Sequence, residues 1–217
     1  MMHQLTVHEV YASIQGESRY AGFPCTFVRL TGCPLRCRWC DTAHAFHEGQ
    51  ILSLAEIVAK VDVFSLPMVE VTGGEPLAQK GTVELLGLFV QKGYKTLIET
   101  SGSEDISLIP PQVHIVMDLK APGSKMEHQN RWENLNFIKR SDDLKIVLSD
   151  LQDFDWAMKI IEQEHLLERS QVLLSCAWGQ LQPKQLSEWM LAHPLARRCR
   201  LQLQQHKYIW SPRTRGV

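Results

Sequence analysis

The sequence predicts an α/β protein, and more specifically a shortened, partly open parallel β/α barrel. Short apolar runs of the kind that form buried strands recur along the chain, and amphipathic stretches separate most of them. Strands that alternate with helices pair in parallel through right-handed crossovers. A complete eightfold barrel takes about 250 residues, so a chain of 217 residues is expected to form an incomplete barrel. We expect one domain over 1–217.

Seven apolar runs are expected to be the strands, at 25–30, 68–71, 95–99, 113–117, 144–148, 172–176 and 200–204. Ser53 and Glu56 have the spacing of a capping box and predict a helix that begins there. Further helices are expected over 81–92, 153–165 and 184–192, the last one entered through Pro183. The link 101–112 is short and contains two prolines, so we expect no full crossover helix in it.

Composition excludes several classes of function. A hydrophobic content of 44% supports one sizeable core, and a formal net charge of -1 with a pI near 6.7 gives no indication of a nucleic-acid or acidic-membrane partner. The N-terminus lacks a basic segment followed by an apolar one, and no apolar run approaches the roughly 20 residues that span a bilayer. We therefore expect a cytoplasmic protein without membrane contact.

Three of the six cysteines lie on one short loop. Cys33, Cys37 and Cys40 have the spacing C-x3-C-x2-C, whereas Cys25, Cys176 and Cys199 are scattered singly and are interpreted as small buried hydrophobic residues. Three thiolates can hold a cubane iron-sulfur cluster or a zinc ion and leave one coordination position without a cysteine. The alternative is a structural zinc site with His44 or His47 as its fourth ligand.

Small or ionisable residues follow nearly every predicted strand. They lie at 31–33, 72–76, 100–102, 118–120, 149–150, 177–179 and 205–207. The carboxyl ends of parallel barrel strands share one face, and active sites are assembled on that face. A zinc-stabilised binding module needs no such arrangement, so the pattern favours an enzyme.

The turn at 72–76 reads Thr-Gly-Gly-Glu-Pro. Gly73 and Gly74 lack a Cβ and would let a ligand approach the backbone closely, and Glu75 could accept hydrogen bonds from a ligand ammonium group. The alternative interpretation is an ordinary turn between a strand and a helix. The presence of the cysteine loop in the same chain favours the ligand site.

The cysteine loop, with Trp39 before its last cysteine, and the following 72–76 turn together resemble the radical S-adenosylmethionine superfamily. The resemblance implies a radical SAM core, that is, an incomplete TIM barrel. It implies that Cys33, Cys37 and Cys40 hold a [4Fe-4S] cluster whose fourth iron is chelated by S-adenosylmethionine. It further implies cofactor contacts from Trp39, Gly73, Gly74, Glu75, Asp118, Leu119, Lys120, Ser175, Cys176, Ala177 and Trp178. Relatives often have Ser-Pro-Lys at 118–120, and some have Gln-Pro at 175–176, so this chain departs from them there.

A second set of motifs narrows the resemblance to the 7-carboxy-7-deazaguanine synthases, from about residue 8 to about residue 210. The motifs lie at 14–17, 27–29, 32–33, 39–42, 71–76, 98–102, 144–145 and 205–208. The resemblance implies substrate contacts from Ile14, Gln15, Gly16, Glu17, Arg29, Thr72 and His206, with Arg29 paired to the substrate carboxylate. It implies that Thr42 ligates Mg2+, a hard cation suited to hydroxyl oxygen. For His206 and Lys145 a structural role stays an open alternative.

This resemblance implies a carbon-nitrogen lyase that converts 6-carboxy-5,6,7,8-tetrahydropterin to 7-carboxy-7-deazaguanine by radical ring contraction with loss of ammonia, on the route to queuosine and related 7-deazapurines. It also implies an external electron donor, a homodimer, and no direct contact with nucleic acid. Two alternatives remain, a glycyl-radical activating enzyme that acts on a partner protein and a zinc-stabilised binding module. The set formed by 15–17 and Arg29 favours a small carboxylated substrate.

Overall fold

A curved nine-stranded sheet forms the centre of the protein. The computed structural model describes residues 4–212 and 214–217, and in it the strands are ordered β3-β1-β2-β4-β5-β6-β7-β8-β9. The strands are β1 (Gln4–Ile14), β2 (Pro24–Leu30), β3 (Gln50–Ser53), β4 (Met68–Gly73), β5 (Lys95–Thr100), β6 (His114–Asp118), β7 (Asp143–Leu148), β8 (Gln171–Cys176) and β9 (Arg200–Gln202). From β2 through β9 every neighbouring pair in this order is parallel, which confirms the expected open β/α barrel.

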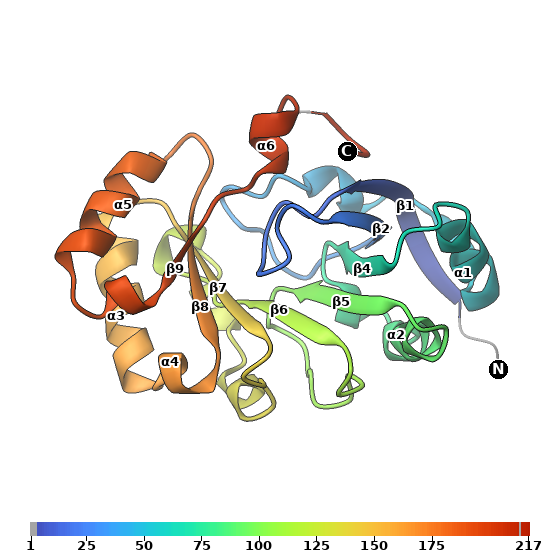
Figure 1. Cartoon of the computed structure of the whole chain (residues 1–217), viewed down its shortest axis with the longest axis horizontal. Coiled ribbons are helices and arrows are strands. Elements are labelled where there is room, and N and C mark those ends of the chain that lie inside the picture. Colours follow the sequence, from blue (N-terminus) through green and yellow to red (C-terminus); the bar gives the residue numbers. More distant parts are fainter. Residues whose placement is uncertain (1–3, 213) are drawn as a thin grey trace.

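Most of the helices lie around the outside of this sheet, as Figure 1 shows. They are α1 (Leu54–Asp62), α2 (Thr82–Gln91), α3 (Leu151–Gln163), α4 (Leu166–Arg169), α5 (Pro183–Ala192) and α6 (His206–Ile209). Short 3-10 helices span Ala43–Phe46, Pro76–Ala78, Pro122–Ser124, Glu127–Gln129, Trp132–Asn136 and Ala196–Arg198. None of the described helices is both long enough and apolar enough to cross a membrane.

The capping box at Ser53 is confirmed. The Ser53 hydroxyl accepts from the backbone N–H of Glu56, and the Glu56 carboxylate accepts from the backbone N–H of Ser53 at 2.8 Å. Ile57 and Val61 are fully buried on the inner side of α1, because their spacing of four residues places them on one face. The expected break between β5 and β6 is also confirmed, since no helix occurs in the described chain between those strands.

Two strands were not predicted. β1 pairs antiparallel with both β2 and β3, so the N-terminal side of the sheet is a small antiparallel extension of the parallel barrel. Most β1 residues are half-buried rather than apolar and enclosed, and β3 has only four residues. Neither segment therefore carries the apolar run that marks a buried strand in sequence. β1 matters for function because it delivers polar side chains to the barrel mouth.

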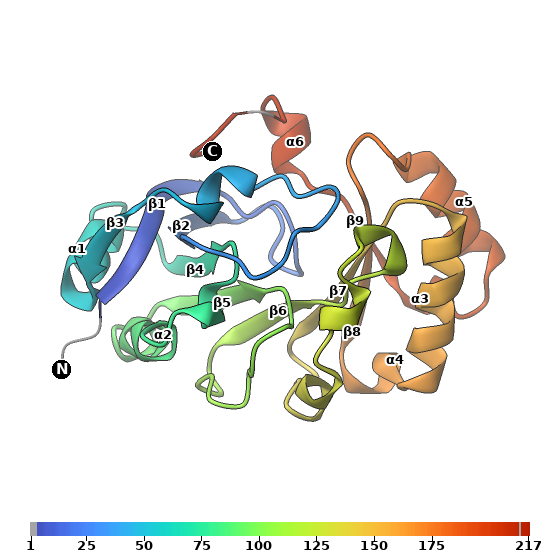
Figure 2. The ribbon, with the colours of Figure 1, turned by 180° about the vertical axis from the view of Figure 1, so that it is seen from behind.

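The hydrophobic core lies between the sheet and its outer helices. Val28, Val71 and Ile98 on neighbouring parallel strands are fully buried, and Leu86 and Phe89 of α2 belong to the same apolar cluster. Cys25 and Cys176 are buried as expected, and Cys199 is half-buried. This packing holds the carboxyl ends of the strands at one end of the barrel. Figure 2 shows that the segment after β2, α6 and the C-terminus gather at that end.

Candidate active site

A cavity of about 240 Å³ opens at the carboxyl ends of the parallel strands. Most of the residues singled out from the sequence line this one cavity. They are Ile14, Gln15, Gly16, Glu17, Arg29, Cys33, Cys37, Trp39, Cys40, Thr42, Thr72, Gly73, Gly74, Asp118, Leu119, Lys120, Ala177, Trp178 and His206. Glu75, Ser175 and Cys176 are described but do not line it. The structure thus brings together residues that are up to 192 positions apart, from Ile14 to His206.

The cysteine loop is held in place mainly by backbone contacts. Gly32 N–H donates to Ala45 O at 2.9 Å, and Arg38 N–H donates to Ser124 O at 3.1 Å. The guanidinium group of Arg36 donates to the carbonyl oxygen of Cys33 at 2.7 Å, which fastens the loop from its outer side. These contacts fix the loop although it contains no α-helix or strand.

The three loop thiols fit an iron-sulfur cluster. Cys33, Cys37 and Cys40 are free, half-buried and directed to the cavity, whereas Cys25, Cys176 and Cys199 do not line it in the described structure. Burial raises the pKa of the Cys33 and Cys37 thiols, so the free thiol form is favoured until a metal supplies positive charge. Three soft ligands with one position left open are the donor set of a site-differentiated [4Fe-4S] cluster.

The Gly73–Gly74 turn packs directly against the start of the cysteine loop. A Cβ on Gly73 would lie 2.3 Å from Leu30 O, and a Cβ on Gly74 would lie 2.2 Å from Gly32 O and 2.7 Å from the Cβ of Cys33. The N–H of Glu75 donates to Gly32 O at 2.9 Å. The need for glycine here therefore comes first from the close approach of two backbone segments, and not only from a ligand as the sequence suggested.

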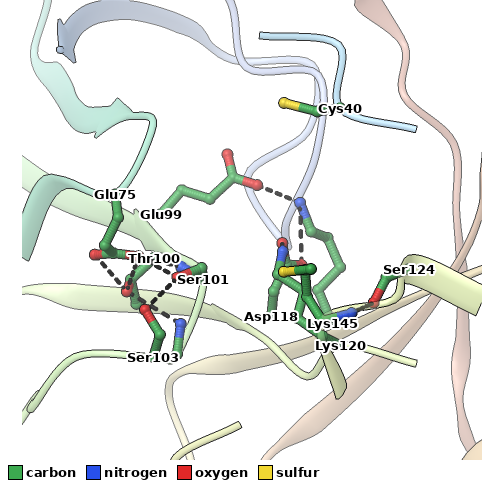
Figure 3. Close-up of polar contacts among 12 residues, drawn as sticks. Cys40, Glu75, Glu99, Thr100, Ser101, Ser103, Asp118, Lys120, Ser124 and Lys145 are labelled. Atoms are coloured by element: carbon green, nitrogen blue, oxygen red, sulfur yellow. Dashed lines mark hydrogen bonds and ion pairs between the residues drawn. The ribbon is translucent and has the colours of Figure 1, made fainter. Parts of the chain in front are cut away.

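The Glu75 carboxylate has a different environment from the one that we expected. It is fully buried and accepts hydrogen bonds from Leu77 N at 2.9 Å, from Thr100 Oγ1 at 2.9 Å, and from Ser101 N and Oγ at 2.6 and 2.5 Å. Figure 3 shows the bonds that Glu75 accepts from Thr100 and Ser101, at the end of β5. Burial raises the pKa of Glu75, and the hydrogen bonds from Ser101 and its neighbours oppose that rise. A contact from Glu75 to a ligand ammonium stays a prediction, and Thr100 and Ser101 line the cavity in its place.

A buried network of charges forms the floor of the cavity. The ammonium group of Lys145 contacts Glu17 Oε2 at 2.8 Å, the Glu99 carboxylate, and Asp118 Oδ1 at 3.5 Å. Lys120 contacts the other oxygen of Asp118 at 2.6 Å (Figure 3). Burial alone would lower the pKa of Lys145, but Asp118, Glu17 and Glu99 raise it well above its ordinary value. Lys145 thus remains a cation that holds three carboxylates around the cavity.

The carboxyl group of Glu70 lies next to this network. Glu70 is 1% exposed and accepts a hydrogen bond from Nε2 of Gln15, and Oε1 of Gln15 accepts from the N–H of Glu17 at 2.5 Å. Burial, with help from Glu99, raises the pKa of Glu70 well above its usual range. A neutral Glu70 and the backbone of Glu17 therefore fix the orientation of the Gln15 amide.

The β1–β2 loop is locked onto the region after β9. Gly16 O accepts from Gln205 N at 3.0 Å, and a Cβ on Gly16 would lie 2.5 Å from Nδ1 of His206. Gln204 Nε2 donates to Glu17 Oε1 at 3.1 Å. Burial lowers the pKa of His206, which favours its neutral form. This contact places His206 beside 14–17 at the cavity wall, as expected for a shared binding site.

Arg29 lies on β2 and points to the cavity rather than to solvent. Its side chain is 14% exposed, which argues against a surface residue. Nε donates to Glu9 Oε1 at 2.7 Å and Nη2 donates to the Tyr11 hydroxyl at 2.7 Å. Burial raises the pKa of Tyr11 to about 12, so its hydroxyl stays protonated. Glu9 and Tyr11 hold the guanidinium group at the cavity wall.

The C-terminal tail contributes to the cavity, which the sequence did not indicate. Pro212, Thr214, Arg215, Gly216 and Val217 all line it. α6 leads into this tail and packs beside the barrel mouth, where Tyr208 contacts Trp178 with ring centroids 5.2 Å apart. No strand or helix pattern marks 211–217, so only the folded structure relates the tail to the site.

Comparison with known proteins agrees with this geometry. The sequence profile of the radical SAM superfamily matches residues 27–146. The chain is 42% identical to 7-carboxy-7-deazaguanine synthase of Chlorobaculum tepidum, over 98% of this chain and 97% of that one. It is 40% identical to the protein of the same name from Koribacter versatilis, over 98% of this chain and 100% of that one.

The fold is also that of a solved relative. The crystal structure of QueE from Escherichia coli superposes with a TM-score of 0.72 at 21% identity and covers 92% of this chain and 93% of that chain. This likeness concerns the fold alone. The superfamily profile covers the cysteine loop and the Gly-Gly turn, and the full-length identity extends beyond them to both termini. The chain therefore belongs to the radical SAM superfamily and, within it, to the 7-carboxy-7-deazaguanine synthase family.

Proposed function

We propose that the chain is a radical SAM enzyme that converts 6-carboxy-5,6,7,8-tetrahydropterin to 7-carboxy-7-deazaguanine with loss of ammonia, in 7-deazapurine biosynthesis. The observation that carries this proposal is that the three loop cysteines and the substrate residues expected from the family share one cavity. Membership in the family supports this enzyme over the glycyl-radical activating enzyme and the zinc-stabilised module.

Cys33, Cys37 and Cys40 would hold the [4Fe-4S] cluster. When bound, the cluster and S-adenosylmethionine supply one-electron, hydrogen-abstracting chemistry. We assign the cofactor contacts to Trp39, Gly73, Gly74, Asp118, Leu119, Lys120, Ala177 and Trp178, which line the cavity. Glu75 would act by holding Thr100 and Ser101 in position. Ser175 and Cys176 would support the wall from behind, because both are buried in β8.

The other side of the cavity suits a flat, carboxylated heterocycle. Arg29 presents a guanidinium group that Glu9 and Tyr11 already orient, and a planar fork of this kind matches a carboxylate. The carboxylates of Glu17 and Glu99 can accept from ring N–H and amino groups. We propose that Ile14, Gln15, Gly16, Glu17, Thr72 and His206 contact the pterin, with Arg29 on its carboxylate.

We propose Mg2+ as a further cofactor, held by the hydroxyl of Thr42. Thr42 lies on the cavity wall close to the cysteine loop, with Oγ1 3.7 Å from Sγ of Cys40, so its hydroxyl would be available to an ion in the cavity. One hydroxyl ligand suits Mg2+, because this ion usually keeps several waters and substrate oxygens in its shell. Thr42→Ala should keep the cluster and slow turnover in a way that depends on Mg2+ concentration. Normal turnover by this variant across a range of Mg2+ concentrations would show that the assignment is wrong.

The remaining parts of the proposal concern the setting of the enzyme. Free thiols on one loop suit a reducing compartment, which supports a cytoplasmic enzyme. The chemistry needs one electron at a time, and we propose that an external donor supplies it. We further propose a homodimer of chains that each form a single domain.

The test is an anaerobic assay of the reconstituted protein with S-adenosylmethionine, reductant and carboxytetrahydropterin, with product identified by mass spectrometry. Cys37→Ala should lose the near-visible absorbance of the cluster together with all product. Cys199→Ala is the matched control, because that thiol lies outside the cavity in the described structure and should leave both unchanged. Formation of deoxyadenosine without the deazaguanine would contradict the substrate and leave the superfamily chemistry intact.

A further inference from the structure

His8, Glu9 and His44 converge at the rim of the active-site cavity. One ring nitrogen of each histidine and one carboxylate oxygen of Glu9 all lie within 4.8 Å of one another. The rings of His8 and His44 lie against each other, with centroids 5.1 Å apart. The sequence alone offered His44 as a possible partner of the cysteines, and the folded chain places its ring against His8 instead.

A β-bulge brings two consecutive residues of β1 to this point. Neighbouring residues of a regular strand point to opposite faces of the sheet. Between Val7 and Glu9 the pairing of β1 with β2 shifts, since Val7 pairs with Leu30 and Glu9 pairs with Arg29, and His8 is the extra residue. A bulge re-aims side chains in this way and is frequent beside functional sites. His8 and Glu9 can therefore serve one centre.

Two of the three groups have an outer partner that orients them. Nδ1 of His8 lies 3.1 Å from Glu48 O, and because a carbonyl oxygen only accepts, Nδ1 carries the proton and Nε2 of the neutral ring keeps its lone pair. Glu9 uses Oε1 to accept from Arg29 at 2.7 Å, which leaves Oε2 for another partner. Metal-binding histidines and carboxylates typically have outer contacts of this kind.

The third group lacks a hydrogen-bond partner among residues 4–212 and 214–217. Nε2 of His44 is buried and has no hydrogen-bond partner within the described structure. A buried polar atom without a partner loses the hydrogen bond that it would make with water, so native structures usually supply a partner. A ligand that accepts a lone pair from the imidazole ring would compensate for this loss.

We propose that His8, Glu9 and His44 form a binding site for a divalent transition-metal ion, with Zn2+ as the best match. Two imidazoles and one carboxylate are a common zinc donor set, whereas Mg2+ prefers oxygen ligands, so this site is separate from the one at Thr42. Zinc bonds of about 2.0–2.1 Å place tetrahedral donor atoms about 3.4 Å apart. The three donor atoms now lie within 4.8 Å of one another, so small side-chain rotations would bring them to that spacing.

The open coordination position would face the cavity, because Glu9 and His44 both line it. Arg29, which contacts Glu9, lies on the same wall. A small carboxylate or water would complete the coordination there. The proposal does not rest on the proposed reaction, since metal binding is measured without turnover.

The test uses the untagged holoenzyme, in which the cluster occupies the three loop thiolates. The protein is dialysed anaerobically to equilibrium against buffered Zn2+ with Mg2+ in large excess, and bound zinc is counted by mass spectrometry. We expect one bound Zn2+ per chain. In His8→Ala and His44→Ala the affinity should fall at least about tenfold, since loss of an outer contact alone has that effect. X-ray absorption at the zinc edge should show nitrogen and oxygen neighbours without sulfur.

His128→Ala is the matched control, because His128 is exposed and lies outside the cluster, and its zinc binding should equal that of the wild type. Near-visible absorbance shows whether each variant keeps its cluster, and the thermal midpoint shows whether it keeps its fold. If an alanine variant loses either, His8→Gln is measured in its place. Equal zinc affinity in the wild type and in every folded His8 and His44 variant would overturn the proposal. Displacement of the zinc by Mg2+, or sulfur in its coordination shell, would overturn it as well.

Discussion

Lys145→Met offers the sharpest test of the charge network on the cavity floor. The substitution keeps an unbranched side chain that is one heavy atom shorter and removes the ammonium group that contacts Glu17, Glu99 and Asp118. Lys145 is 3% exposed, so water cannot replace it at low cost. Removal of one partner from a buried ion pair typically costs about 3–5 kcal/mol of the free energy of unfolding. We expect a loss in this range at pH 8.

The loss should shrink as the pH falls. In the wild type, burial alone would raise the pKa of Glu17 and Asp118, but Lys145 and Lys120 lower it below the ordinary value. These groups therefore stabilise the fold above their unfolded pKa, and that stability is lost as pH falls through their folded pKa. Without Lys145, burial of Glu17 raises its folded pKa above the unfolded value, whereas Asp118 keeps its contact with Lys120. The variant then loses stability as pH rises from about 4.5, so its deficit is larger at pH 8 than at pH 5.

The assay is urea denaturation of the reduced, cluster-free chain at pH 5 and pH 8. With a slope of about 2 kcal/mol per molar urea, the pH 8 midpoint should fall by roughly 1.5–2.5 M. Lys92→Met is the control, because its ion pair with Asp62 is exposed, with side-chain exposures of 43% and 39%, and no resolvable shift is expected. A loss of equal size at both pH values would refute the electrostatic reasoning and point to packing alone.

Two further predictions concern the walls of the cavity. Gly16→Ala should displace the His206 ring, because the new Cβ would lie 2.5 Å from its Nδ1. The KM for the pterin should then rise at least about tenfold, with the cluster content unchanged. Gly87→Ala is the control and should leave the KM unchanged, because its new Cβ would have no atom within 4 Å. An unchanged KM in Gly16→Ala would show that His206 does not bind substrate. Glu75→Gln should lower the free energy of unfolding by roughly 1–3 kcal/mol, because an amide cannot accept all the hydrogen bonds that Leu77 and Ser101 donate. The measurement is calorimetric thermal unfolding, and a result that matches the wild type would contradict this role of Glu75.

The fold class and the centre of the site could be predicted from short continuous segments of the sequence. The cysteine loop and the Gly-Gly turn are continuous segments, and their chemistry depends on spacing alone. The parallel strands were accessible because each is a buried apolar run whose polar residues follow at its carboxyl end. β1 was missed because its residues are half-buried and its pairing is antiparallel, so neither apolar continuity nor a following helix marks it.

The polar floor of the cavity could be predicted only in part. Glu70 and Lys145 are charged residues inside apolar runs, and this signal alone marks them as unusual. Their partners could not be predicted from the sequence, because Lys145 contacts Glu17, 128 positions away along the chain, and Glu70 contacts Gln15, 55 positions away. Such contacts depend on the curvature of the sheet, and the approach of 212 and 214–217 to the cavity likewise follows only from the folded chain.

The backbone contacts between the Gly-Gly turn and the cysteine loop have a consequence for how this enzyme tolerates change. Gly74 N–H donates to Leu30 O at 3.2 Å and Glu75 N–H donates to Gly32 O at 2.9 Å, so main-chain hydrogen bonds join the turn to the start of the cysteine loop. The separation between the cysteine ligands and the cofactor seat is then a main-chain property. Exchange of side chains at exposed loop positions such as Pro34 and Arg38 is therefore expected to leave that separation unaltered. Engineering of electron delivery can therefore proceed on the outer side of the loop while the alignment of iron and cofactor is preserved.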